Sequence, residues 1–266
     1  METSHQPPRP RLLAVAGALL LLLLTSPAFA NGILRPSPNF AAPDTARAAG
    51  AILWLHGAYD TVNDPAPPPE APFVARFART HWDIWRLDRT TRPDPLPGAE
   101  AALIDALHTL HAKGYHHIIV AGHSRGAFIA LAALAHPDLA DAVAAISPAA
   151  HGTSPDRRPQ ALADYMALLK AARPPMRLAL VQFTGDPFDP DPKARSEAAD
   201  GAGLKVLHIF EPKDPTGHMG VFEPDFDTIY GERLVKFLKG KARPGALPLD
   251  PASRAQARPT EGQGSL

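Results

Sequence analysis

The sequence predicts an α/β fold in which a mostly parallel central sheet of about six to eight strands carries helices on both faces. Short apolar segments alternate along the chain with helical segments of about ten to fifteen residues, the order expected for strand–helix–strand units. The apolar segments are largely continuous and do not alternate with polar residues, as strands covered on one face only would. No internal repeat is visible.

Six segments are predicted to be strands because each is short, rich in aliphatic or aromatic residues and bounded by turn residues. In chain order they are residues 51–57, 82–88, 116–121, 141–147, 177–183 and 204–210. The first, AILWLHG, runs into Gly57, and the third leads directly into a glycine-flanked serine.

The segments between these strands are predicted to be helices. In chain order they are residues 69–80, 99–114, 125–136, 159–172, 192–203 and 226–240. In the second helix Leu103, Leu107 and Leu110 recur at helical spacing, and Gly114 is a natural stop. The third helix ends before Pro137, which cannot continue it.

The first thirty residues are predicted to be a secretory signal peptide. Arg9 and Arg11 precede an apolar run of about 15 residues, and small residues follow up to Ala30. An uncleaved anchor is the alternative, but spanning a bilayer takes about 20 apolar residues. We therefore expect cleavage after Ala30, no stable membrane span afterwards, and export to the periplasm or the outside of the cell.

The mature chain is predicted to hold one domain. Residues 31–50 are expected to be an irregular N-terminal segment, residues 51–240 the folded domain, and residues 241–266, rich in Pro, Ala and polar side chains, a disordered tail. The oligomeric state is left open.

Composition excludes several classes of function. Formal net charge is zero, which argues against nucleic acid as a partner. The chain has no cysteine, so thiolate catalysis, thiolate–metal sites and disulfides are excluded. His108 and His111 lie three residues apart on a predicted helix, but no third ligand is evident. No metal and no cofactor is expected.

Ser124 is the candidate nucleophile. It lies in Gly-His-Ser-Arg-Gly, between a predicted strand and a predicted helix, where a sharp turn would project its hydroxyl above the sheet edge. Such a turn needs small residues two positions away on each side, as Gly122 and Gly126 are. The alternative is a tight turn whose serine only caps the helix.

A serine hydroxyl needs a base, and His218 is the candidate. It lies between Gly217 and Gly220 after the last predicted strand, so its loop can reach the same sheet edge. Two carboxylates, Asp186 and Asp189, follow the preceding strand, and either could orient the imidazole. Each could instead only shape a proline-rich turn.

The backbone amides of Arg125 and Ala58 are the candidate oxyanion donors. Arg125 would begin a helix, so its N–H has no partner within that helix. Ala58 follows the first predicted strand, with Tyr59 as an adjacent alternative. His56, Gly57, Tyr59 and His123 are further candidates for lining the cleft. The Arg125 side chain would lie at the rim as a possible substrate contact.

Taken together, His56-Gly57, the Gly122–Gly126 motif, the aspartate after a later strand and Gly217-His218 resemble the α/β-hydrolase superfamily. The order serine, aspartate, histidine is also that family's order. The resemblance covers about residues 51–240 and implies a serine esterase-like protein. Relatives often carry Gly-x-x-Asp-Pro-x-x-Pro at the acid, and the closer match here favours Asp186. Because residues 148–176 hold one short predicted helix, we expect a minimal lid or none.

The resemblance implies hydrolysis of a small-molecule carboxylic ester through an acyl-enzyme on Ser124. Four alternatives remain open: a peptidase, an amidase or an acyltransferase with the same three residues, or a non-catalytic protein of this fold that binds a ligand.

Overall fold

A computed structural model describes residues 32–59, 67–89, 94–189, 191–240 and 245–246. These residues form an eight-stranded sheet in the order β1-β3-β2-β4-β5-β6-β7-β8. The strands are β1 Gly32–Pro36, β2 Gly50–Leu55, β3 Trp82–Arg89, β4 Ile118–His123, β5 Ala142–Ile146, β6 Arg177–Gln182, β7 Lys205–Phe210 and the two-residue β8 Gly245–Ala246. The mostly parallel sheet predicted from the sequence is confirmed.

Among the described strands, only β1 runs antiparallel, against β3, and every other pair of neighbouring strands is parallel. After the edge strand β1, the chain enters the sheet at β2, moves outward to β3, and then crosses back to β4 on the other side of β2. The strand order therefore reverses between β2 and β4. Ligand sites of open α/β sheets lie at the carboxyl ends of the strands beside such a reversal.

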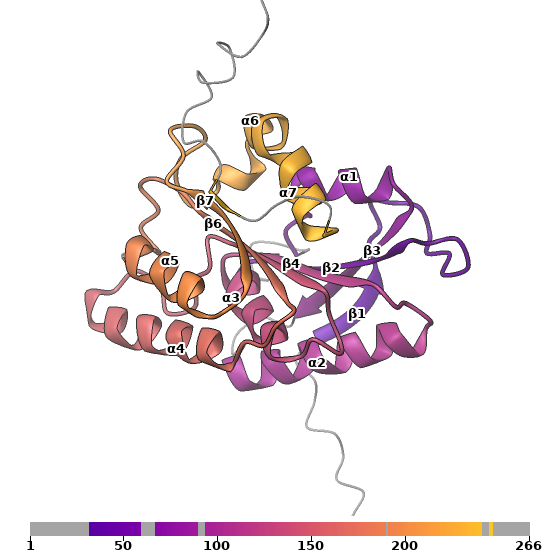
Figure 1. The fold of residues 1–266 in the computed structure, drawn as a ribbon, viewed down its shortest axis with the longest axis horizontal. Coiled ribbons are helices and arrows are strands. Elements are labelled where there is room, and N and C mark those ends of the chain that lie inside the picture. The colour runs from indigo at the N-terminus through magenta and orange to yellow at the C-terminus, as the bar shows by residue number, and fades with distance from the viewer. Residues whose placement is uncertain (1–31, 60–66, 90–93, 190, 241–244, 247–266) are drawn as a thin grey trace, which may run out of the picture.

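Helices cover both faces of the sheet (Figure 1). On one face lie α2, α3, α4 and α5, and on the other lie α1, α6 and α7. Their bounds are α1 Ala75–Ala78, α2 Leu96–Ala112, α3 Arg125–Ala130, α4 Arg158–Ala171, α5 Pro192–Gly201, α6 Pro224–Phe226 and α7 Glu232–Leu238. Within the described residues, no helix is both long and apolar enough to cross a bilayer.

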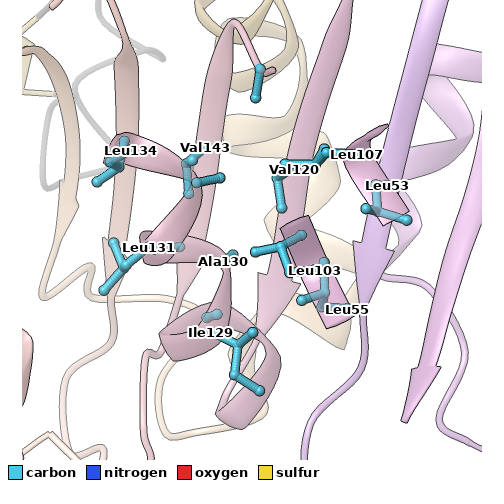
Figure 2. Packing of buried hydrophobic residues seen from close by; sticks show 14 of the residues in the cluster. Leu53, Leu55, Leu103, Leu107, Val120, Ile129, Ala130, Leu131, Leu134 and Val143 are labelled. Atoms are coloured by element: carbon cyan, nitrogen blue, oxygen red, sulfur yellow. The ribbon is translucent and has the colours of Figure 1, made fainter. Parts of the chain in front are cut away.

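Each face of the sheet has its own apolar core because successive strand residues point to opposite faces. Leu53, Leu55, Val120 and Val143 point toward α2 and α3, where they meet Leu107 and other helix side chains (Figure 2). The opposite core joins alternate strand residues to the aromatic side chains of α1, α6 and the segment before α1. Two buried layers hold the central strands rigid, so the loops at their ends start from fixed positions.

The prediction of an irregular segment over residues 31–50 was wrong for its first part, since Gly32–Pro36 forms the edge strand β1. An edge strand pairs on one side only and needs no continuous apolar run, and Ile33 is 66% exposed. In the predicted tail, Gly245–Ala246 pairs with β7 as β8. The predicted signal peptide and the rest of the tail lie outside the described residues.

Candidate active site

Ser124 occupies a strained turn between β4 and α3. Its backbone has φ 54° and ψ −120°, a region that residues with a side chain rarely adopt. Two hydrogen bonds fix the turn: Ser124 N–H donates to Ile146 O at 2.9 Å, and Ala149 N–H donates to Ser124 O at 3.1 Å. Within the described part of the chain, the hydroxyl makes no capping hydrogen bond to α3. The reading of Ser124 as a helix cap was therefore wrong.

The two glycines of the motif are there because other backbone passes close to them. A Cβ on Gly122 would lie 2.5 Å from the carbonyl carbon of Gly126. A Cβ on Gly126 would lie 2.1 Å from Leu55 O, at the end of β2. No side chain can move aside to relieve these contacts, since the opposing atoms belong to the main chain. The glycines thus let α3 begin directly against β2 and β4.

His218 is held by Asp186. Its Nδ1 lies 2.9 Å and 2.8 Å from the two carboxylate oxygens, and both side chains are largely buried. A carboxylate accepts, so Nδ1 carries the hydrogen and Nε2 is left as the nitrogen that can take a proton. The loop is fixed through Gly217, whose N–H donates to Thr184 O at 2.8 Å. Gly217 has φ 73°, which suits glycine.

The His218 ring packs between two aromatic rings. The His123 ring lies 4.8 Å away and the Phe188 ring 4.3 Å away, measured between centroids. His123 Nε2 also lies 2.8 Å from His218 O, and because a carbonyl only accepts, Nε2–H is the donor. His123 immediately precedes Ser124, so this bond joins the serine turn to the histidine loop.

Asp189 contacts other partners. Arg195 Nε lies 3.3 Å from its Oδ1, and Gln182 Nε2 donates to its Oδ2 at 2.6 Å. Burial raises the pKa of Asp189, against the opposing effects of Arg195 and Gln182. Arg195 Nη1 in turn donates to Pro148 O at 2.6 Å. The structure therefore brings Asp186 to His218 and places Asp189 in an internal ion pair between α5 and the loop after β6.

A cavity of about 500 Å³ opens over the serine turn at the carboxyl ends of β2 and β4. Its lining is drawn from the loops after five strands, β2 to β6, namely His56, Gly57, Ala58, Tyr59, Asp94, Ser124, Arg125, Ala149, Ala150, Gly152 and Phe188. Ser124, both candidate oxyanion residues and three of the four candidate cleft residues share it. His123 is not among the residues that line the cavity, and its ring packs against His218 and Phe222.

His56 is a structural support and not a second base. Its Nδ1 lies 2.6 Å from Gly57 O, and its Nε2 accepts from Arg89 N–H at 3.0 Å. Both ring nitrogens are engaged in the neutral form, and a second ring proton would displace the Arg89 amide. Burial, with the neighbouring charge of Arg89, lowers the pKa of His56 to about 4. The ring therefore fixes the backbone that carries Ala58 after β2.

The arrangement can support nucleophilic attack on a carbonyl. A serine lies on a strained turn, and a histidine with an oriented ring lies on the loop after β7. The two residues whose amides are candidate oxyanion donors, Ala58 and Arg125, line the same cavity as the serine. Among the described residues, no group of three or more His, Cys, Asp and Glu side chains is placed to hold a metal ion.

Sequence reasoning did not find Asp94, Phe188 or Ala149–Gly152 in the cavity wall. Phe188 could have been predicted, because it lies between the two candidate aspartates and therefore belongs to their loop. Asp94 had no signal in its local sequence, and Ala149–Gly152 lie in the segment 148–176, which the sequence indicates only as the place where a lid would be.

No protein-family model and no curated protein matches the sequence. Solved structures do match. Esterase B from Lactobacillus rhamnosis aligns with a TM-score of 0.55 at 14% identity, over 78% of this chain and 85% of that one. An esterase/lipase from an uncultured bacterium aligns with a TM-score of 0.55 at 17% identity, over 79% and 85%.

A Pyrococcus horikoshii acylaminoacyl peptidase also aligns, with a TM-score of 0.55 at 13% identity, over 77% of this chain but only 39% of that one. At such identities the likeness concerns the fold. The strand order, the serine turn after β4 and these neighbours together establish that the chain has the α/β-hydrolase fold.

Proposed function

We propose that the protein is a serine hydrolase that cleaves carboxylic esters through an acyl-enzyme on Ser124. The observation that carries the proposal is the pairing of His218 with Asp186, joined through His123 to the adjacent Ser124, which is held at φ 54° in the wall of a cavity. The backbone of Ser124 is strained, and its side chain does not cap α3. The free energy that this strain costs is not explained by a purely structural role.

In the proposed mechanism, His218 Nε2 takes the Ser124 proton as the oxygen attacks the ester carbonyl. Asp186 holds the ring and stabilises the imidazolium that forms. The backbone amides of Arg125 and Ala58 receive the developing oxyanion. His218 then protonates the leaving alcohol, and a water molecule activated by the same histidine releases the acid.

The cavity supports small esters as substrates. Its volume of about 500 Å³ suits a small molecule, and small residues, Ala149, Ala150 and Gly152, form one wall. Helix α4, which lies in the region where a lid would be, buries Tyr165 and Leu169 in the core beside the sheet. That packing disfavours a mobile apolar cover and hence action at a lipid interface.

The decisive experiment is Ser124→Ala, assayed on short-chain p-nitrophenyl esters and on the matching p-nitroanilides. We expect ester turnover to fall by at least about 10⁴-fold, because the hydroxyl is the attacking group. Thermal melting should show that the variant is folded. Ser154→Ala is the matched control, since Ser154 is exposed and its side chain caps nothing among the described residues.

An unchanged rate for Ser124→Ala would end the proposal. Faster turnover of the anilides than of the esters by the unmodified protein would instead replace the esterase with a peptidase or amidase. A protein that turns over neither and does not react with a fluorophosphonate would be a non-catalytic member of the fold.

A further inference from the structure

We propose that Asp94 is a positioning residue that holds the two oxyanion donors at a fixed separation, acting through Arg89 and Arg125. The inference rests on the proposed function, since it assigns the donors to Ala58 and Arg125. Asp94 lies between β3 and α2, and its carboxylate contacts two arginines, Arg89 at the end of β3 and Arg125 in the serine turn.

The first arm of this network runs through Arg89 to the loop after β2. Arg89 Nε lies 3.2 Å from Asp94 Oδ2, and its Nη2 donates to His56 O at 2.6 Å. The Arg89 backbone N–H also donates to His56 Nε2. His56 is two residues from Ala58, so Arg89 fixes both the carbonyl and the ring of the segment that carries this donor.

The second arm runs through Arg125 across the serine turn. Arg125 Nε lies 3.4 Å from the same Asp94 Oδ2, and its Nη2 donates to Asp94 O. Its Nη1 donates to Ala150 O at 2.8 Å, in the loop after β5. Arg125 itself supplies the second donor amide. Its side chain therefore links the segment that carries this amide to the loop before α2 and to the loop after β5.

Burial makes this network stiff. The Arg89 side chain is 1% exposed, and those of Asp94 and Arg125 are 15% and 16% exposed. Burial lowers the pKa of Arg89, and Asp94 opposes that effect. A buried ion network is poor evidence for stability alone, because apolar residues of similar size often serve as well. Its value here lies in directional bonds that apolar packing would not provide.

The same contacts decide between two roles for the Arg125 side chain. A substrate contact at the cleft rim would need a guanidinium turned toward the cavity and free to bind. Three of its nitrogens are instead directed at Asp94 and Ala150. The geometry therefore favours positioning over recognition of an anionic substrate, and the two roles change different kinetic constants.

The test is Asp94→Asn, which keeps the shape of the side chain but removes the charge that both guanidinium groups share. We expect kcat for p-nitrophenyl butyrate to fall about 10- to 100-fold, with KM within about two-fold, because oxyanion donors act mainly in the transition state. The acid limb of the kcat/KM profile should keep its midpoint, since the contact between His218 and Asp186 is untouched.

Asp227→Asn is the matched control. Asp227 also binds an arginine, with Arg76 Nε 2.5 Å from its Oδ1, but on the opposite face of the sheet. Its kinetic constants should equal those of the unmodified protein. If Asp94→Asn does not fold, Arg125→Met decides, because it removes the second arm of the network and keeps the donor amide. The two substitutions combined should cost less than the sum of the two, because both remove the contact between Arg125 and Asp94.

An unchanged kcat in Asp94→Asn would overturn the inference, as would a raised KM with kcat preserved, which would indicate a substrate contact. The proposed function is judged separately. Activity retained in Ser124→Ala refutes both ideas, whereas an inactive Ser124→Ala with a fully active Asp94→Asn refutes only the role of Asp94.

Discussion

Asp186 and Asp189 are carboxylates three positions apart in one loop, and their contacts give them different roles. Asp186 contacts His218 with both oxygens, while Asp189 is turned to Arg195 and Gln182. The sequence favours Asp186 through its match to the family's acid loop but leaves both open. The missing information is the position of Arg195, which reaches Asp189 only after α5 packs beside β6.

Replacing each aspartate by asparagine should separate these roles. Asp186→Asn leaves His218 facing an amide, which permits the wrong ring tautomer, so we expect kcat for ester hydrolysis to fall about 10³- to 10⁴-fold while folding is kept. Asp189→Asn leaves Arg195 buried without its counter-charge, and we expect it to lower the free energy of unfolding by about 3 kcal/mol.

The two measurements are ester kinetics and urea unfolding, made on the same preparations. The folded fraction of Asp189→Asn should retain most of its kcat. A larger loss of kcat at Asp189 than at Asp186 would reverse the assignment of the orienting acid, and a stable Asp189→Asn would contradict the structural role given to its ion pair.

At the scale of elements, the close approach of α3 to β2 depends on Gly126. In Gly126→Ala the new methyl carbon would meet Leu55 O and His56 O, 2.1 Å and 2.5 Å away in the unrelaxed backbone. Helix α3 must then move, and the Arg125 amide moves with it. We expect a loss of about 3 kcal/mol in stability and at least a 100-fold loss in kcat.

Gly201→Ala is the matched control for this prediction. Gly201 is the last residue of α5, and a Cβ there would meet nothing within 4 Å. Removing a helical glycine should leave ester turnover unchanged and stability equal or slightly higher, by up to about 1 kcal/mol. A Gly126→Ala protein with normal melting temperature and turnover would show that the turn tolerates a side chain.

Elements with strong local signals could be predicted from the sequence, and those fixed by tertiary packing could not. The bounds of strands β2–β7 agree with those of the predicted apolar segments to within one or two residues at each end. The predicted helix over residues 125–136 keeps α-helical form only to Ala130 and continues as a 3₁₀-helix to Ala135. The last predicted helix contains a π-helical turn at Asp227–Gly231, where Asp227 bonds to Arg76.

The residues of the candidate site also differ in whether the local sequence or tertiary packing reveals them. Ser124, His218 and their flanking glycines stand out because a sharp turn restricts the residues beside it. The network of Asp94 with Arg89 and Arg125 does not, because its contacts join the loops after three different strands, β2, β3 and β4. Only the strand order, with β2 between β3 and β4, brings those loops together. Charged residues at the end of the otherwise buried β3 were the one available hint.

At the scale of the whole molecule, two buried histidines tie stability to pH. Burial lowers the pKa of His56 to about 4 and that of His123 to about 4, against an ordinary value of 6.5. Between about pH 4 and pH 6.5, these two histidines bind protons in the unfolded chain but not in the folded protein. Stability is therefore full above about pH 6.5 and is lost as the pH falls toward 4, by at most about 3 kcal/mol for each histidine.

Melting temperatures measured from pH 7 to pH 4.5 should fall by about 10 °C through these two groups. His123→Gln keeps a donor for His218 O but cannot take a proton, so its melting curve should lose about 5 °C less over the same range. His116→Gln is the matched control, because His116 is exposed. Its curve should follow that of the unmodified protein. If His123→Gln also runs parallel to the unmodified protein, His123 does not bind its proton mainly on unfolding, and the acid sensitivity must come from His56 or from the buried carboxylates.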